Sequence, residues 1–131
     1  MPHKPGAHYT REAIRAEYNA DGTTPWFVVR HGDKVCALRL RRSNNPRISS
    51  TPAQVWIGKG ADREPWGERL ATVAGPIQLY VAETDNEDIY TYLGAYHVTG
   101  TTQEPQDLLA AQQMPGIGPL SRIVYLTGLH E

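Results

Sequence analysis

The segment Ala53-Gln-Val-Trp-Ile-Gly-Lys-Gly-Ala-Asp-Arg-Glu-Pro-Trp66 decides how this chain is interpreted. Trp56 stands between two aliphatic residues, which predicts a short strand with the indole on the opposite face from its neighbours. Gly58 and Gly60 permit positive φ angles or the close approach of another group, and Lys59 lies between them. Such a strand end is typical of the mouth of a ligand site. The alternative is an ordinary strand-to-helix turn whose tryptophans pack in the core.

The composition predicts one domain over residues 1–131, with residues 1–8 as a flexible lead-in. The 10 prolines and 12 glycines favour many turns and short helices. A net charge of −1 gives no overall basic field, so a nucleic-acid surface would be a local patch. No apolar run approaches the roughly 18 residues of a membrane span, and no signal peptide is evident. We therefore expect a cytoplasmic protein with no membrane partner.

Residues 25–42 predict a β-hairpin whose second arm alternates apolar side chains with basic ones, which gives one buried face and one basic face. The segment 39–47 carries four arginines and no acidic residue. Arginines neutralise phosphates and asparagines bond base edges, so this segment is a candidate nucleic-acid surface. The alternative is a solvated strand edge protected by charge. The candidate nucleic-acid-binding residues are Arg39, Arg41, Arg42, Asn44, Asn45, Arg47 and Lys59.

The longest predicted strand covers residues 89–99, where Tyr90, Tyr92 and Tyr96 share one face around Gly94. A tyrosine row of this kind forms either a stacking floor for bases or one flank of an aromatic core. The acidic turn that precedes it is expected to lie far from any surface that binds a polyanion.

Short helices are predicted over residues 11–18 and 65–74, and a third near residue 105 turns Leu108 and Leu109 inward. Strands and helices in this order predict a β-rich α+β domain. We expect a curved sheet or partly open barrel of about six strands, PUA-like in general character, with two or three short helices.

Motifs for catalysis are missing from the sequence. There is no Walker loop, dinucleotide-binding fingerprint, His-Glu-x-x-His motif or nucleophile elbow. The single cysteine excludes an internal disulfide and a zinc site built on several cysteines. Asp62, Glu64 and His97 are the only candidates for acid–base roles in a hydrolase or transferase, and each has a simpler structural explanation. We therefore expect no catalytic residues, no metal and no cofactor.

Five segments in this order resemble a known family. They are Leu38-Arg-Leu-Arg-Arg-Ser-Asn-Asn-Pro46, Val55-Trp-Ile-Gly-Lys-Gly60, Gly75-Pro-Ile-Gln-Leu-Tyr80, Tyr92-Leu-Gly-Ala-Tyr-His-Val98 and Arg122-Ile-Val-Tyr-Leu126. Across residues 25–127 the chain resembles the modified-base-reading N-terminal domains of McrA-like, HNH-linked, modification-dependent restriction endonucleases. It departs from the whole enzymes because it has no HNH histidine constellation, and its overall charge is not basic.

The resemblance implies a non-catalytic module that recognises modified cytosine in DNA, either alone or as the specificity domain of a restriction system. Its expected partners are DNA with modified cytosine and a nuclease domain or subunit, and a homodimer stays open. The candidate base-pocket residues are Trp56, Gly58, Gly60, Trp66, Tyr92 and Tyr96. Two alternatives remain: a PUA-like domain for RNA or a nucleotide ligand, and a hydrolase or transferase for a small substrate.

Overall fold

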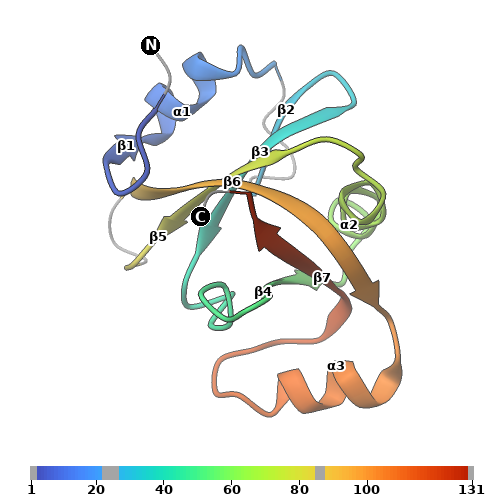
Figure 1. Ribbon diagram of the computed structural model, residues 1–131. Coiled ribbons are helices and arrows are strands. Elements are labelled where there is room, and N and C mark those ends of the chain that lie inside the picture. The colour runs from blue at the N-terminus through green and yellow to red at the C-terminus, as the bar shows by residue number, and fades with distance from the viewer. Residues whose placement is uncertain (1–2, 22–26, 85–87, 130–131) are drawn as a thin grey trace.

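The computed structural model describes residues 3–21, 27–84 and 88–129 (Figure 1). The first two residues of the predicted hairpin, 25 and 26, lie outside these ranges. The predicted α+β class, the curved sheet and the short helices are confirmed. In chain order the elements are β1 (His8–Thr10), α1 (Arg11–Glu17), β2 (Val28–His31), β3 (Lys34–Arg41), β4 (Ala53–Gly58), α2 (Glu64–Ala71), β5 (Ile77–Ala82), β6 (Ile89–Thr102), α3 (Pro105–Gln112) and β7 (Leu120–Gly128).

The strands form one sheet in the order β2-β3-β5-β6-β7-β4, and β1 pairs with the first part of β6. All of these pairs are antiparallel except β3 with β5, which run parallel. A parallel pair requires a long crossover, and here the connection contains β4 and α2. The arginine-rich end of β3 therefore lies beside the end of β5, with Arg41 opposite Ala82.

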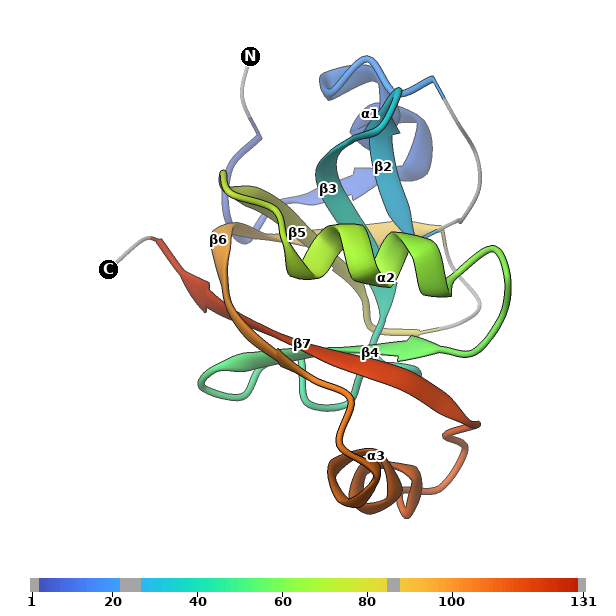
Figure 2. The same ribbon diagram turned by 90° about the vertical axis from the view of Figure 1, so that its right-hand side faces the viewer.

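The long strand β6 makes the sheet curl. Its first part pairs with β5 and its second part with β7, and the register shifts once in each ladder. Gly94 has a φ of 111° close to the first shift, a conformation that favours glycine. Because β6 bends between its two partners, the sheet becomes a half barrel with β2 and β4 as its edge strands (Figure 2).

Three short helices lie along the curled sheet, with α1 and α3 at opposite ends and α2 between them (Figures 1 and 2). Thr10 caps α1, since its hydroxyl accepts a hydrogen bond from the N–H of Ala13 at 3.2 Å. Helix α2 packs on β4, β6 and β7. A Cβ at Gly67 would stand only 2.8 Å from Cγ2 of Ile57, so a glycine at this position allows α2 to approach β4. No helix in the described ranges is long and apolar enough to cross a membrane.

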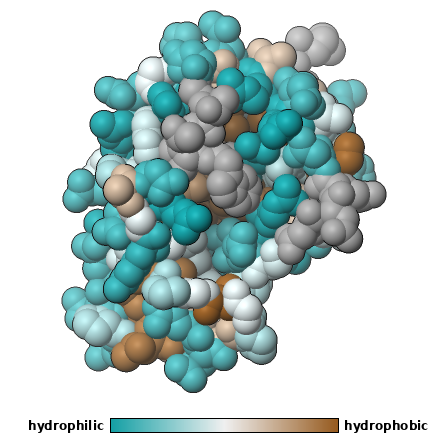
Figure 3. All heavy atoms as spheres, turned by 180° about the vertical axis from the view of Figure 1, so that it is seen from behind, coloured by the Kyte–Doolittle hydropathy of each residue, from teal (hydrophilic) through white to brown (hydrophobic). Residues whose placement is uncertain are grey.

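Three clusters of buried side chains fill the domain. The largest lies between the sheet and α2, and includes Leu38, Leu70 and Val124. A second lies beneath α1 and contains several tyrosines. The third joins Trp56 to α3 and β7. Within α3, however, the predicted inward direction of Leu109 is wrong, because its side chain is 56% exposed. Figure 3 shows hydrophobic atoms on the surface at the lower end of the molecule.

The predicted basic face of β3 is wrong at Arg39, which is 8% exposed. Its Nη1 donates a hydrogen bond to the Tyr90 hydroxyl at 2.9 Å and lies 3.7 Å from a carboxylate oxygen of Asp88. The guanidinium also lies over the Tyr90 ring, 5.4 Å from its centroid. Apolar clusters cover both faces of β3, so alternation along this strand does not separate a buried face from a solvated one.

Candidate ligand pocket

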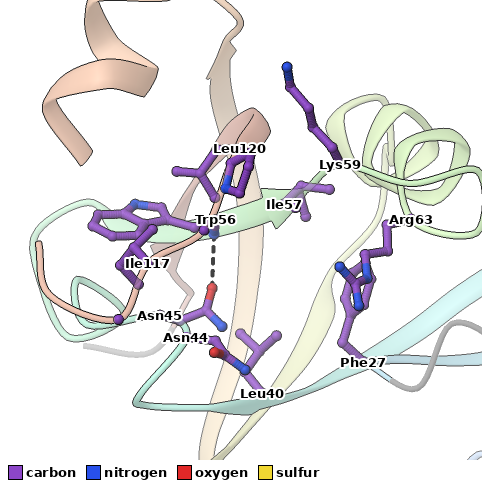
Figure 4. A pocket seen from close by; sticks show the side chains of 14 residues that line it. Phe27, Leu40, Asn44, Asn45, Trp56, Ile57, Lys59, Arg63, Ile117 and Leu120 are labelled. Carbon is purple, nitrogen blue, oxygen red and sulfur yellow. Dashed lines mark hydrogen bonds between the residues drawn. The ribbon is translucent and has the colours of Figure 1, made fainter. Parts of the chain in front are cut away.

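A pocket of about 300 Å³ occupies the open side of the half barrel (Figure 4). It lies there because β4 and the β2–β3 hairpin are the two ends of the sheet and do not pair with each other. Its volume is at the lower end of the range for small-molecule sites, on the order of 300–1,000 Å³, which suits one planar ring with its substituents. The lining residues are Phe27, Leu40, Asn44, Asn45, Trp56, Ile57, Gly58, Lys59, Arg63, Gly116, Ile117, Gly118, Pro119 and Leu120.

The walls of the pocket are mainly apolar. Figure 4 shows Trp56 and Ile117 on one side and Phe27 on the other, with the asparagines between them. Trp56 is 7% exposed and is held by packing against α3 and β7. Its ring N–H donates to the side-chain oxygen of Gln54 at 3.0 Å, so the indole has a fixed orientation. A rigid aromatic wall of this kind binds a flat heterocycle by apolar contact.

The neighbouring asparagines differ in their partners. Asn45 is 4% exposed, and its Oδ1 accepts the backbone N–H of Trp56 at 2.8 Å. This bond joins the loop after β3 to the edge strand β4 across the opening. Asn44 is exposed and lines the pocket, and its side-chain amide makes no hydrogen bond with any described residue. Asn45 therefore supports the pocket, whereas Asn44 can offer both a donor and an acceptor to a ligand.

Two cationic side chains, Lys59 and Arg63, line the pocket. Neither forms a hydrogen bond or ion pair with a residue that the structure describes. No acidic residue is among the described residues of the lining, so the pocket attracts anions. The turn between them depends on Gly60, which has a φ of 145° and donates its N–H to Oε2 of Glu64 at 3.0 Å.

The arginines at the end of β3 have partners inside the protein. Arg42 makes two hydrogen bonds to the Glu83 carboxylate, at 2.7 and 3.0 Å, and these hold the pKa of Glu83 below its ordinary value. Arg41 donates to the backbone oxygen of Thr84. Acidic residues of the turn predicted to be remote are therefore the partners of the basic segment. The parallel β3–β5 pair places both strand ends together, which local sequence does not reveal. Arg47 is exposed and does not line the pocket.

Three of the predicted base-pocket aromatics lie elsewhere. Trp66 on α2 contacts two guanidinium groups, with Arg30 at 4.9 Å and Arg69 at 4.4 Å from its ring centroid. Tyr96 packs against the largest core cluster, and burial raises the pKa of its hydroxyl. Tyr92 is buried in the cluster beneath α1.

Four tyrosine rings of that region and the His3 ring contact one another and are called the tyrosine cluster below: Tyr9, Tyr18, Tyr80, Tyr92 and His3. The hydroxyl of Tyr80 bonds to that of Tyr18 at 2.7 Å and to Nδ1 of His3 at 2.5 Å. Burial raises the pKa of Tyr18 to about 12, and that of Tyr80 far above its ordinary value. His3 stacks on Tyr9, so part of the predicted lead-in covers this cluster. The predicted row is divided: Tyr90 and Tyr92 belong to the cluster beneath α1, whereas Tyr96 packs against the largest cluster, so the prediction that the three share one face is wrong. The register shift beside Gly94 separates them.

The sequence interpretation placed Trp56, Gly58, Lys59 and both asparagines in a site, and the structure brings these residues together in one pocket. It missed Phe27, Arg63 and Leu120, which come from segments far apart in the chain. Only Arg63 had a local signal, because it closely follows the glycine–lysine turn.

The residues considered for acid–base catalysis do not converge. Asp62 and Glu64 are absent from the lining, and His97 lies in β6, where its Nδ1 is buried with no hydrogen-bond partner among the described residues. Within the described ranges, no group of three or more His, Cys, Asp and Glu side chains is placed to hold a metal ion. Comparisons of the chain with protein-family models, curated proteins and solved structures give no significant match.

Proposed function

We propose that this domain is a non-catalytic reader of modified cytosine in DNA, acting in the cytoplasm alone or with a nuclease domain or subunit. The observation that carries the proposal is the pocket itself. Apolar walls surround a space that suits one base, and the amide and two cations of its lining have no side-chain partner among the residues that the structure describes. These are the groups needed to contact a ring, its polar edge and its phosphate.

The pocket is recessed between strands, so a base stacked inside a duplex does not reach its walls. Enzymes and readers solve this problem by turning the nucleotide out of the helix, at a cost of a few kcal/mol. An added methyl group contributes about 1 kcal/mol when it is buried. Close fit against Leu40, Ile57 and Leu120 would therefore supply much of the discrimination between modified and plain cytosine.

Gel shifts at low salt test this proposal with three duplexes of one sequence, which carry 5-methylcytosine, 5-hydroxymethylcytosine or plain cytosine. We expect at least one modified duplex to bind about tenfold more tightly than the plain one, since about 1.4 kcal/mol corresponds to a factor of ten. Equal or undetectable binding of all three would overturn it. Adding single-stranded RNA of the same sequence as a competitor tests the alternative, because RNA that displaces the duplex completely would favour an RNA-binding domain.

A further inference from the structure

We infer that Arg63 binds the phosphate of the nucleotide whose base fills the pocket, and that Gly58 holds open the place where its guanidinium lies. The inference rests on the proposed function, because it takes the occupant to be a nucleotide. It assigns the phosphate to a residue outside the arginine-rich segment 39–47.

The contact between Gly58 and Arg63 carries the argument. A Cβ added to Gly58 would lie 3.2 Å from Nη1 and 3.7 Å from Cδ of Arg63, so the arginine lies directly over the strand end. Gly58 is not among the positive-φ glycines, and a side chain there is opposed by crowding rather than by backbone strain. The glycine thus leaves space for the guanidinium at the pocket.

Arg63 and Lys59 differ in direction. Figure 4 shows the guanidinium of Arg63 turned toward Phe27 at the pocket, whereas the Lys59 side chain extends away from it. Lys59 is therefore placed for a more distant phosphate along a strand, and Arg63 for the phosphate next to the bound base. A guanidinium can also donate two parallel hydrogen bonds to phosphate oxygens, which an ammonium cannot do with the same geometry.

The acidic side chains that the structure describes near Arg63 do not pair with its guanidinium, which can therefore bind an anionic ligand. Asp62 and Glu64 flank Arg63 in the sequence, but neither forms an ion pair with it, and Glu64 accepts the N–H of Gly60 instead. Arg42 and Arg69, in contrast, pair with Glu83 and Asp33. A charged donor that lines an apolar pocket, with no counter-ion among residues 3–21, 27–84 and 88–129, fits an anionic group attached to an apolar ring.

Calorimetric titration with 5-methyl-2′-deoxycytidine and its 5′-monophosphate tests the inference. We expect the unmodified protein to bind the nucleotide about tenfold more tightly than the nucleoside, in line with one charge-assisted contact. Arg63→Gln should abolish this preference and leave nucleoside affinity unchanged. Arg11→Gln is the matched control, since it removes one arginine from α1, at the far end of the sheet, and should keep the preference.

Gly58→Ala tests the placement without changing the charge. The added methyl group would lie 3.2 Å from Nη1, so the guanidinium must move by a few tenths of an ångström. The preference for the nucleotide should therefore fall about twofold while the thermal midpoint stays close to that of the unmodified protein. Arg63→Lys should retain part of the preference. Full preference in Arg63→Gln, or equal loss of nucleoside and nucleotide binding, would overturn the inference, as would failure of the nucleotide to bind.

Duplex binding separates this inference from the proposed function. If Arg63→Gln keeps full nucleotide preference while the unmodified protein still selects modified duplexes, only the assignment of Arg63 fails. If nucleotide preference depends on Arg63 but no duplex binds, the DNA-reader proposal fails and the phosphate site stands. In the second case the source of the phosphate is a free nucleotide rather than a DNA strand.

Discussion

The pocket and the tyrosine cluster both combine aromatic and polar side chains, but they differ in whether the polar groups have partners within the protein. In the tyrosine cluster every hydroxyl has a partner: Tyr18 bonds to Tyr80, Tyr92 donates to Gln78, and Tyr9 accepts a backbone N–H from Lys4. In the pocket, Asn44, Lys59 and Arg63 have none among the described residues. Aromatic and polar residues in proximity are therefore not enough to indicate a site. Polar groups that the protein leaves without partners distinguish the pocket from a structural cluster.

The arginines show the same distinction. Arg39 pairs with Asp88, just before β6, and Arg42 pairs with Glu83, just after β5. These ion pairs neutralise the positive charge that the sequence suggested for phosphate binding. Arg63 lies in a less basic stretch, and no acidic side chain in the described part of the chain forms an ion pair with it. Local charge density in the sequence is therefore a poor guide to the charge that is available to a ligand.

Among substitutions in the pocket, Trp56→Ala should cause the largest loss of stability and of affinity for methylated DNA. It removes a buried wall that packs against α3 and β7, so we expect a loss of about 3–5 kcal/mol of stability and at least a hundredfold loss of affinity for methylated DNA. Urea denaturation and gel shifts measure the two effects. Trp56→Phe is the control and should recover most of both. A folded Trp56→Ala protein with normal affinity would remove the indole from the site.

Tyr80→Phe should lower stability through the tyrosine cluster and leave the pocket unchanged. It deletes the hydroxyl that joins Tyr18 to His3 and leaves both without that partner, at a cost of about 1–3 kcal/mol. Affinity for methylated DNA should be unchanged, because Tyr80 does not line the pocket. Denaturant midpoints and gel shifts on one preparation provide the measurement. A large loss of affinity with little loss of stability would show that the tyrosine cluster belongs to the site.

Asn44 and Asn45 allow a side chain available to a ligand to be compared with a structural one at neighbouring positions. Asn45→Ala leaves the backbone N–H of Trp56 without its acceptor, so stability should fall by about 1–3 kcal/mol. Asn44→Ala should change stability by less than about 0.5 kcal/mol but lower ligand affinity about tenfold. Thermal melts combined with titration of the methylated nucleotide measure both changes. Equal effects of the two variants on stability would contradict the assigned roles.

Alkaline pH should weaken the tyrosine cluster. The folded protein holds the Tyr18 proton with a pKa of about 12, whereas the unfolded chain loses it near 10. The contribution is therefore complete below pH 10 and is lost as the pH rises toward 12. Urea midpoints measured across this range should fall, and they should fall less steeply in Tyr18→Phe. A midpoint that is constant from pH 9 to 12 would argue against a buried neutral hydroxyl.

The sequence was most informative where local rules apply. Alternation around Trp56 and the two following glycines predicted a strand end with a close contact, and the contact is made by Arg63. Hydrophobic pattern and turn residues also predicted most of the strands. Long-range pairing was outside the reach of such rules. The parallel β3–β5 pair decides which charges Arg41 and Arg42 meet, and the curl of β6 brings Phe27 near the β4 edge.

The most direct test follows backbone and side-chain amide signals of the ¹⁵N-labelled protein during titration with 5-methyl-2′-deoxycytidine 5′-monophosphate. The indole N–H of Trp56, the side-chain amide of Asn44 and the backbone amides of Gly58 and Lys59 should shift in a saturable manner. The amides of Tyr9, Tyr18 and Tyr80 should stay unchanged. Shifts confined to the tyrosine cluster, with none at the pocket, would contradict the assignment of the pocket as the ligand site.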